Sequence, residues 1–317
     1  MSKRSNNQGR AYEYICLTSL QEAISKLRPS VIEQNSSYDA ALRAWNTLST
    51  EEQSVYAESA DVAVKTIFQL EPHIIEEGED MLKLFIQQDK SGEQGDVRDI
   101  VISRNKIRWE IGLSVKHNHF AVKHSRLSPS IDFGDKWFGI PCSQTYWDEV
   151  KPVFDLLKQK QSQRCEFNEL EDKDRQVYIP LLKAFMREIE VQYASHSDLP
   201  TKMVEYLLGK YDFYKIISID TKQITQIQSY NLHSTLNKAT KKTKPTIVIP
   251  VADLPTRIIS MDFIPKRTNT LELYLDKGWA FTFRIHNAER MVIPSLKFDI
   301  QFLGLPASII TINSQWK

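Results

Sequence analysis

Cysteine is scarce in this sequence, with Cys16, Cys142 and Cys165 the only three among 317 residues. They are far apart and form no CxxC pair, which excludes a zinc finger and a disulfide scaffold. No apolar run approaches the roughly 20 residues that a membrane-spanning helix needs, and the polar first residues lack the apolar segment of a signal peptide. We therefore expect a reduced, cytoplasmic protein with no membrane partner.

An excess of charge of either sign is also missing, because 41 Lys and Arg residues balance 40 Asp and Glu residues. A near-neutral total fits an enzyme that must release a DNA product. The charges are nevertheless uneven, since residues 71–94 are acidic and residues 215–257 are basic. Such a basic segment indicates either a cationic surface for a polyanion or an ordinary solvated surface.

The order of the predicted elements favours an α+β fold. Apolar spacing predicts helices near residues 11–27 and 49–70, and Ser49–Glu52 has the form of a capping box. Further helices are expected at 119–127, 145–160, 168–194 and 201–210. Strands are expected at 81–86, 97–102, 107–115, 216–219, 247–251, 271–275, 279–285, 298–302 and 309–312. The pattern predicts two regions, 1–212 and a β-rich region at 213–317.

The most informative stretch lies between Asp99 and Lys116. Asp99 begins one predicted strand and Lys116 ends the next, so in a hairpin the two side chains can meet at one edge of the sheet. Ser114 shares a face with Lys116, because side chains alternate along a strand. Glu110 is six residues from Lys116, roughly 20 Å at the rise of a strand, which is too far to serve the same centre. A carboxylate beside a lysine can hold a divalent cation and a water molecule.

An Asp on one strand, followed by an acid-x-Lys tripeptide on the next, resembles the PD-(D/E)xK nucleases. Asp99 would match the first carboxylate and Ser114-Val115-Lys116 the tripeptide, with Ser114 standing where the pattern has an acid. Many members of this fold supply a carboxylate from the first helix instead. The segment Gly9–Tyr14 looks like that helix and offers Glu13, while Asp96 is the alternative.

Longer segments are similar to a family of type II restriction endonucleases. The segment His117–Ser128 resembles a signature of these enzymes, and Gly278–Ala288 and Pro294–Ile300 resemble their tail block. Taken together, the chain resembles the HaeIII restriction endonuclease family over essentially its full length. The resemblance implies a PD-(D/E)xK core of helix, mixed sheet with a catalytic hairpin, and helix, with helical insertions and a β-rich C-terminal region.

The resemblance also implies an activity, which is Mg²⁺-dependent cleavage of double-stranded DNA at GGCC, between the central G and C, leaving blunt ends. A palindromic target favours a homodimer, although some enzymes of this kind cut as monomers. The implied system partner is a DNA methyltransferase that protects host sites, as a separate chain. The catalytic residues would be Asp99, Lys116, Glu13, Asp96 and Ser114, and the metal ligands Asp99, Asp96 and the carbonyl of Val115.

Residues able to contact DNA occur in three places. The segment Lys123–Arg126 is either a solvated helix face or a phosphate contact, and Lys238–Lys244 has the character of a mobile basic loop that neutralises phosphates. Arg and Lys side chains near the C-terminus can donate to guanine edges in the major groove. The full set of expected DNA contacts is Asn118, Lys123, His124, Ser125, Arg126, Lys241, Lys242, Arg284, His286, Asn287, Ser295 and Lys297.

Other interpretations remain open at this stage. The letters His117-Asn118-His119 do not constitute an HNH nuclease motif, whose residues are dispersed through a ββα unit. A zinc site from His117, His119 and His124 lacks a supporting cysteine cluster. The substitution at Ser114 is compatible with a non-catalytic DNA-binding module, and a junction or repair nuclease of the same fold is a further alternative.

Overall fold

Two β-sheets organise the computed structural model, which describes residues 3–88 and 95–316. The chain divides into two compact units around them. Unit 1 comprises Met1–Phe120, Gly209–Asp253 and Ala307–Lys317, and unit 2 comprises Ala121–Leu208 and Leu254–Pro306. In the described ranges, no helix is both long and apolar enough to cross a membrane.

The sheet of unit 1 has seven strands among the residues described, in the order β1-β2-β3-β4-β6-β7-β12. Their bounds are β1 Ser30–Ile32, β2 Leu82–Ile86, β3 Ile100–Arg104, β4 Trp109–His117, β6 Phe213–Ile219, β7 Ile224–Tyr230 and β12 Thr311–Gln315. Strands β2, β3 and β4 form an antiparallel meander. Strand β6 then pairs with β4 in parallel, which requires a long crossover between them.

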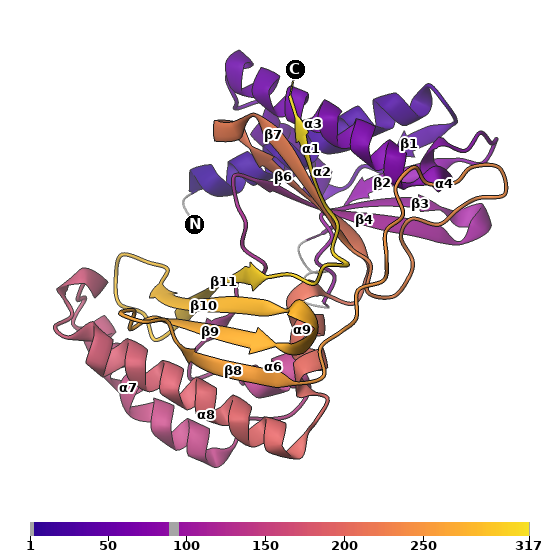
Figure 1. Ribbon diagram of the computed structural model, residues 1–317. Coiled ribbons are helices and arrows are strands. Elements are labelled where there is room, and N and C mark those ends of the chain that lie inside the picture. The colour runs from indigo at the N-terminus through magenta and orange to yellow at the C-terminus, as the bar shows by residue number, and fades with distance from the viewer. Residues whose placement is uncertain (1–2, 89–94, 317) are drawn as a thin grey trace. The chain divides into compact units, whose positions relative to one another are not determined.

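One face of this sheet packs against helices, as Figure 1 shows for α1 and α3. The helices of unit 1 are α1 Lys3–Ser25, α2 Ser36–Trp45, α3 Thr50–Leu70 and α4 Pro72–Ile75. Leu113 and Val115 of β4 share a buried core with Tyr12 and Leu17 of α1. Because side chains alternate, Ser114 and the other even-numbered residues of β4 lie on the opposite face.

The expected capping box at the start of α3 is confirmed. The side chain of Ser49 accepts a hydrogen bond from the Glu52 amide, and the Glu52 carboxylate accepts one from the Ser49 amide. Two of the four otherwise unpaired donors at this helix end are thereby satisfied. The helix begins at Thr50, as the sequence predicts.

Unit 2 is built on an antiparallel sheet in the order β5-β11-β10-β9-β8. Its strands are β5 Arg126–Leu127, β8 Ile258–Phe263, β9 Thr270–Leu275, β10 Ala280–Asn287 and β11 Leu296–Gly304, and its helices are α6 Phe133–Phe138, α7 Gln144–Ser162, α8 Ile179–Ser195 and α9 Leu199–Leu208. Helices α7 and α8 lie side by side (Figure 1). The Phe185 ring of α8 lies 5.9 Å from that of Phe283 and 5.0 Å from that of Phe298, which buries one face of the sheet.

The division into units differs from the expected boundary between residues 212 and 213. Strands β6, β7 and β12 belong to the β-rich C-terminal part of the sequence, yet they extend the sheet of unit 1: β6 pairs with β4 of the meander, β7 pairs with β6, and β12 pairs with β7. The segment 121–208 is instead grouped with 254–306. Pairing between strands that are far apart in the sequence therefore determines which segments belong to each unit. Local composition does not reveal this pairing.

Two expected elements are absent from the described structure. The helix predicted at 119–127 is wrong, because this segment runs along β11: Val122 donates to the Ile300 carbonyl and Phe298 donates to that of Ser125, each at 2.8 Å. The strand predicted at 247–251 is also wrong, since these residues have no ladder partner. Strands β1, β7 and β8 were not predicted. β1 is short and β7 carries many polar residues, whereas β8 is largely apolar and its pattern was missed.

Candidate active site

Asp99, Ser114 and Lys116 come together where β3 begins and β4 ends. The Oδ2 atom of Asp99 accepts hydrogen bonds from Lys116 Nζ at 2.9 Å and from Ser114 Oγ at 3.2 Å. It also accepts one from the backbone amide of Val115 at 2.6 Å. Three donors on one oxygen fix the orientation of the carboxylate. The hairpin thus places the three residues side by side, as strand parity predicts.

The charge of Lys116 is stabilised by nearby acids. Burial alone would lower the pKa of its ammonium, but the charge of Asp99, the hydrogen bond to Asp99 and the charge of Glu13 outweigh burial and raise the pKa. The side chains of Lys116 and Asp99 are 29% and 22% exposed, so both remain accessible from solvent. Glu13, on α1, is therefore close enough for its charge to act on this centre.

The donor set suits a hard divalent cation. Within the described residues, Asp99 Oδ1 accepts no hydrogen bond, so this oxygen can serve as a ligand. Glu13 adds a second carboxylate, and carboxylate and carbonyl oxygens are the ligands that Mg²⁺ prefers. In their chemistry, the carboxylates of Asp99 and Glu13 therefore fit a divalent cation.

Asp96 and Glu110 are engaged elsewhere. Asp96 binds Arg98 through several hydrogen bonds, including one of 2.7 Å to Nη2, and it accepts another from Gln87. Glu110 binds Nη1 of the same arginine at 2.8 Å. The Arg98 side chain lies over Gly112, where a Cβ atom would come within 1.8 Å of Arg98 Cδ. Of the two acids that the sequence offered as second carboxylate, only Glu13 acts on Lys116.

Lys215 is a residue of this region that the sequence analysis did not single out. It lies on β6 opposite Ser114 in the parallel ladder, is 4% exposed, and donates from Nζ to the Phe120 carbonyl at 3.0 Å. Burial and the charge of Lys116 lower the pKa of Lys215 to about 7, while Asp99 acts in the opposite direction. A lysine inside the apolar run 213–219 was the signal that could have revealed it.

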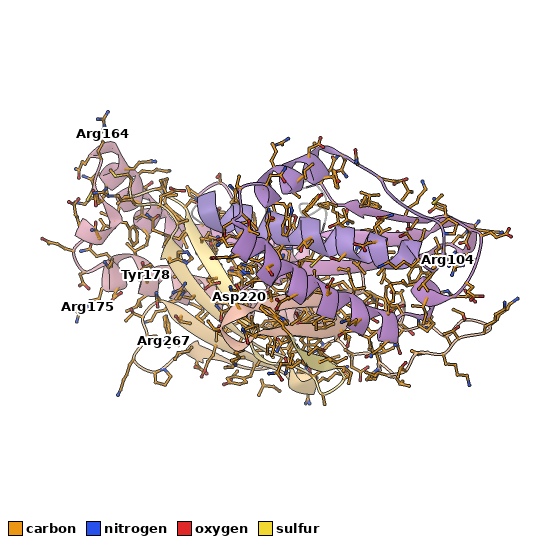
Figure 2. The ribbon with its side chains drawn as sticks, turned by 90° about the horizontal axis from the view of Figure 1, so that it is seen from above. Arg104, Arg164, Arg175, Tyr178, Asp220 and Arg267 are labelled. Carbon is orange, nitrogen blue, oxygen red and sulfur yellow. The ribbon has the colours of Figure 1, made fainter. Side chains whose placement is uncertain are left out.

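His117 and Asn118 form a network of their own just after Lys116. His117 Nε2 lies 2.7 Å from Asp220 Oδ2 and Nδ1 lies 3.1 Å from the Tyr56 hydroxyl, so both ring nitrogens have partners. Asn118 donates to Asp220 at 2.9 Å. Asp220 lies well away from Arg104 within unit 1 (Figure 2). This arrangement does not present His117 to a zinc ion, and it ties Asn118 to the protein.

Four of the expected recognition residues of unit 2, which are Arg126, Arg284, His286 and Lys297, lie on one face of its sheet. Arg126, Lys297 and His286 are direct neighbours across β5, β11 and β10. Arg126 donates to Ser295 Oγ at 3.3 Å. Arg284 is 51% exposed and pairs with Asp299 at 3.1 Å. These side chains lie on the face opposite Phe283 and Phe298, as the alternation along the strands requires.

Four other expected DNA contacts have partners within the fold or are buried. Lys123 donates to the Tyr206 carbonyl at 2.7 Å and lies over that ring, and burial lowers its pKa to about 8. His124 Nδ1 lies 3.3 Å from the Phe298 carbonyl, and Ser125 is buried. Asn287 donates to two nearby carbonyls of its own loop. The contacts of Lys123 and Asn287 reduce their availability to a nucleic acid.

The basic loop holds Lys241 and Lys242, which are both exposed. Its base is fixed by Asn237, whose side-chain amide donates to the carbonyls of Leu70 at 2.7 Å and Ile247 at 3.0 Å. The loop therefore offers cations to solvent from a firmly anchored position.

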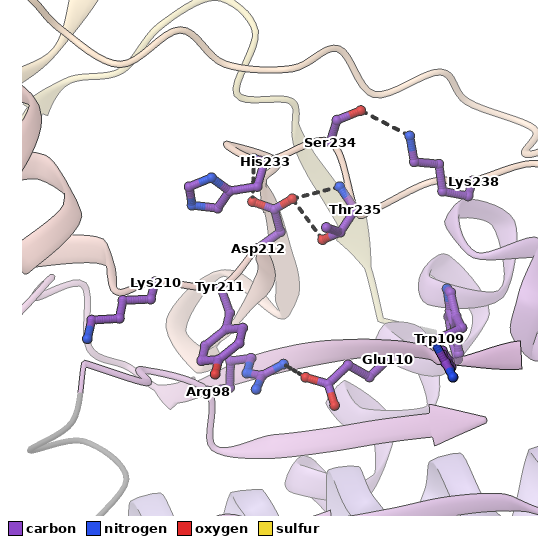
Figure 3. Close-up of a pocket in the computed structure, with 11 residues that line it drawn as sticks. Arg98, Trp109, Glu110, Lys210, Tyr211, Asp212, His233, Ser234, Thr235 and Lys238 are labelled. Atoms are coloured by element: carbon purple, nitrogen blue, oxygen red, sulfur yellow. Dashed lines mark hydrogen bonds and ion pairs between the residues drawn. The ribbon is translucent and has the colours of Figure 1, made fainter. Parts of the chain in front are cut away.

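A separate pocket of about 460 Å³ lies in unit 1 (Figure 3). Its lining residues are Arg98, Arg108, Trp109, Glu110, Lys210, Tyr211, Asp212, His233, Ser234, Thr235 and Lys238. Neither Asp99 nor Lys116 is among them. Among its lining residues, Arg98 forms an ion pair with Glu110, and Lys238 donates a hydrogen bond to the hydroxyl of Ser234. The pocket is thus distinct from the Asp99–Lys116 centre.

Comparison with known proteins identifies the class. The profile of the HaeIII restriction endonuclease family matches residues 9–306. The Type II restriction enzyme HaeIII of Haemophilus aegyptius is 52% identical over 100% of both chains. No solved structure matches the chain.

A chain with this likeness is a type II site-specific deoxyribonuclease, an enzyme that cleaves DNA at particular sequences. It belongs to the HaeIII restriction endonuclease family. The resemblance that the sequence motifs indicated is therefore confirmed.

Proposed function

We propose that this enzyme cleaves double-stranded DNA at GGCC, between the central G and C, with Mg²⁺ as cofactor. The observation that supports the cleavage centre most directly is the convergence of Lys116, Ser114 and the Val115 amide on one oxygen of Asp99. The target sequence is carried over from the family resemblance, and the 52% identity to HaeIII supports it.

The chemistry follows from the positions of the side chains. Asp99, Glu13 and the Val115 carbonyl would hold the magnesium ion, which would supply Lewis-acid activation of a water and stabilisation of the leaving 3′ oxygen. The ammonium of Lys116, held by Asp99, orients the attacking water and stabilises negative charge on the phosphate. Ser114 supports Asp99 through its hydroxyl. Asp96 is a salt-bridge partner of Arg98 in this proposal, not a metal ligand.

We also propose that unit 1 contains the PD-(D/E)xK core. Its support is the order of elements: helix α1, the antiparallel meander β2-β3-β4, a crossover, and the parallel strand β6. Asp99 immediately precedes the second strand of that meander and Lys116 lies on the third, an order that resembles the motif. Under this proposal, unit 1 cleaves the DNA and unit 2 recognises the bases.

Recognition is assigned mainly to the exposed face of the unit 2 sheet. Arg284, Lys297 and Arg126 can donate to guanine edges, and every base pair of GGCC contains a guanine. His286 and Ser295 flank them on the same strands or the loop beside them. Lys241 and Lys242 neutralise phosphates without reading sequence. We also propose that the enzyme acts as a homodimer on the palindrome and that it is cytoplasmic. A separate methyltransferase would protect the host sites.

Digestion of plasmid DNA tests this function. Purified enzyme with Mg²⁺ is expected to yield discrete fragments whose sequenced ends all lie at GG/CC, whereas EDTA abolishes cutting. Fragments with ends at another fixed sequence would refute the target. Cutting at branched structures alone would favour a junction nuclease, and binding without any cutting would favour a non-catalytic module.

A further inference from the structure

The pocket of about 460 Å³ in unit 1 lies on the same face of the sheet as the proposed catalytic lysine. Its lining includes Glu110 of β4 and Arg98, whose side chain fills the space into which a Cβ atom of Gly112 would point. Side chains alternate along a strand, so the even-numbered residues Glu110 and Gly112 share a face with Lys116. One face of β4 therefore carries both the pocket and the cleavage centre.

The acids of this pocket are already engaged. Four of its lining residues are Arg or Lys, and two are acids. The Glu110 carboxylate binds Arg98 at 2.8 Å. Asp212 is 3% exposed and accepts hydrogen bonds from the amides of Leu232 at 2.7 Å and Thr235 at 2.8 Å. The remaining cations are thus in excess, and Asp212 fixes the loop that forms one wall of the pocket.

The cations in excess are Arg108, Lys210 and Lys238. All three are exposed, and within the described ranges none of them pairs with a carboxylate. Lys238 Nζ donates to Ser234 Oγ at 3.0 Å, which leaves the other donors of its ammonium for a ligand. Lys210 and Lys238 lie on opposite sides of the pocket (Figure 3). Arg and Lys are the side chains that bind phosphates, so the pocket suits a phosphate group.

The position of the pocket along β4 matches DNA that flanks the target. Gly112 and Glu110 come four and six residues before Lys116, which is about 13 and 20 Å at the rise of a strand. Each strand of a duplex carries one phosphate for about 3.4 Å of the helix axis, so this span corresponds to about four to six base pairs. A central cut in GGCC leaves only half of that short target on each side. A duplex that extends along β4 from the cleavage centre therefore reaches the pocket beyond its recognition sequence.

Building on the proposed function, we propose that this pocket binds the DNA backbone outside GGCC, with Arg108 and Lys210 as its main phosphate ligands and Lys238 beside them. Phosphates carry no sequence information, so this contact adds affinity for any DNA that continues past the target. Glu110 keeps Arg98 in place in this account and does not contact the DNA.

Fluorescence anisotropy in Ca²⁺ tests the proposal on a duplex that extends about ten base pairs beyond GGCC on each side. The pocket variant is Arg108→Gln with Lys210→Gln. Its matched control is Lys106→Gln with Lys222→Gln, since both lysines are exposed and lie outside the pocket. We expect the slope of log affinity against log salt to fall by about 2 for the pocket variant and to keep its wild-type value for the control. Thermal melting monitors folding, and Lys210→Gln alone, with an expected fall of about 1, replaces an unstable double variant.

Methylphosphonates, which are uncharged, locate the contact when they replace one phosphate at a time, symmetrically in both strands. In the wild type, replacement about four to six base pairs from the cut should weaken binding, whereas the pocket variant should no longer respond there. An unchanged salt slope, an equal fall in the control, or a coupled phosphate inside GGCC would overturn the proposal. Calorimetry with dGMP supplies the last comparison: if the pocket variant loses dGMP binding and keeps its DNA affinity, the pocket serves a free nucleotide and the proposal is wrong.

The outcomes also separate this inference from the proposed function. A wild-type enzyme that cuts GGCC in Mg²⁺, together with a pocket variant that binds the long duplex as tightly as the wild type, would disprove the inference alone. A wild-type enzyme that fails to cut GGCC would refute the proposed function, and the salt slopes would still report whether the pocket binds DNA.

Discussion

A single carboxylate oxygen, Asp99 Oδ2, organises the candidate active site. It receives donors from Ser114, from Lys116 and from the Val115 amide, and so fixes the end of β4 against the start of β3. The other oxygen, Oδ1, can serve as a metal ligand. If Asp99 holds both Lys116 and the metal, as the proposed function requires, it should be intolerant of substitution.

The two acids that the sequence offers as second carboxylate, Glu13 and Asp96, should respond differently to substitution. Glu13→Gln should lower the rate of cleavage by more than about 100-fold, because losing a metal ligand should cost more than the roughly 10–100-fold lost with a residue that only orients a ligand. The substitution should also weaken Ca²⁺ binding. Asp96→Asn should leave Ca²⁺ affinity close to that of the wild type and should lower the free energy of unfolding by about 3–5 kcal/mol, because it leaves the buried Arg98 with one exposed partner.

Calorimetric Ca²⁺ titration and urea denaturation distinguish the two substitutions. If Asp96→Asn loses metal while Glu13→Gln retains it, the second carboxylate comes from Asp96 and the present assignment is incorrect.

The alternation of side chains along the two strands was sufficient to predict that Asp99, Ser114 and Lys116 come together, because hairpin pairing and side-chain alternation are local rules. These local rules could not show that the Arg98 side chain lies over Gly112 and donates a hydrogen bond to Asp96. Nor could they reveal Lys215, whose partner strand is about 100 positions away in the chain. Contacts made by side-chain conformation or by distant strand pairing leave little signal in one sequence.

At the scale of elements, Glu71 links the end of α3 to the base of the basic loop. Its carboxylate accepts hydrogen bonds from the Tyr214 hydroxyl and from the Asn237 amide at 2.7 Å. Burial raises the pKa of Glu71 to about 7, although both hydrogen bonds act to lower it. An acid with a raised pKa in the folded state binds its proton more tightly there than in the unfolded chain.

The stability contributed by this proton is fully present below the unfolded pKa and is lost as pH rises toward 7. Glu71→Gln mimics the protonated acid, so its free energy of unfolding relative to the wild type should increase between pH 5 and pH 8, by at most about 3 kcal/mol. Urea denaturation at both pH values measures this difference. A difference that stays constant with pH would show that Glu71 has an ordinary pKa.

Local sequence patterns predicted the elements whose hydrogen-bond partners lie close together in the sequence. The capping box of α3 and the meander β2-β3-β4 follow from spacing alone. The segment from Lys123 to Arg126 was predicted as helix, yet it lies along β11 because backbone groups of that strand are available to it. A distant strand thus overrode a local propensity.

At the scale of the whole molecule, the proposed function assigns the cleavage residues to unit 1 and the base-reading residues to unit 2. Arg284→Ala should cost roughly 1–3 kcal/mol of binding to a GGCC duplex and little to a scrambled duplex, because a base contact is lost. Replacing Lys241 and Lys242 together by Ala should weaken both duplexes equally and reduce the salt slope by about 2.

Fluorescence anisotropy in Ca²⁺, at several salt concentrations, measures both effects. If Arg284→Ala weakens both duplexes to the same extent, Arg284 contacts phosphate or supports the fold through Asp299. If it changes neither, recognition resides elsewhere in the chain.

The most direct measurement is the single-turnover rate of GGCC cleavage at saturating Mg²⁺ for Asp99→Ala and Lys116→Ala, with Glu110→Ala as an acid on the same hairpin outside the centre. We expect both active-site variants to lose a factor on the order of 1,000 or more, while they remain folded, and Glu110→Ala to cut at close to the wild-type rate. A wild-type rate for Asp99→Ala or Lys116→Ala, or the loss of cleavage in Glu110→Ala alone, would contradict the assignment of the catalytic centre.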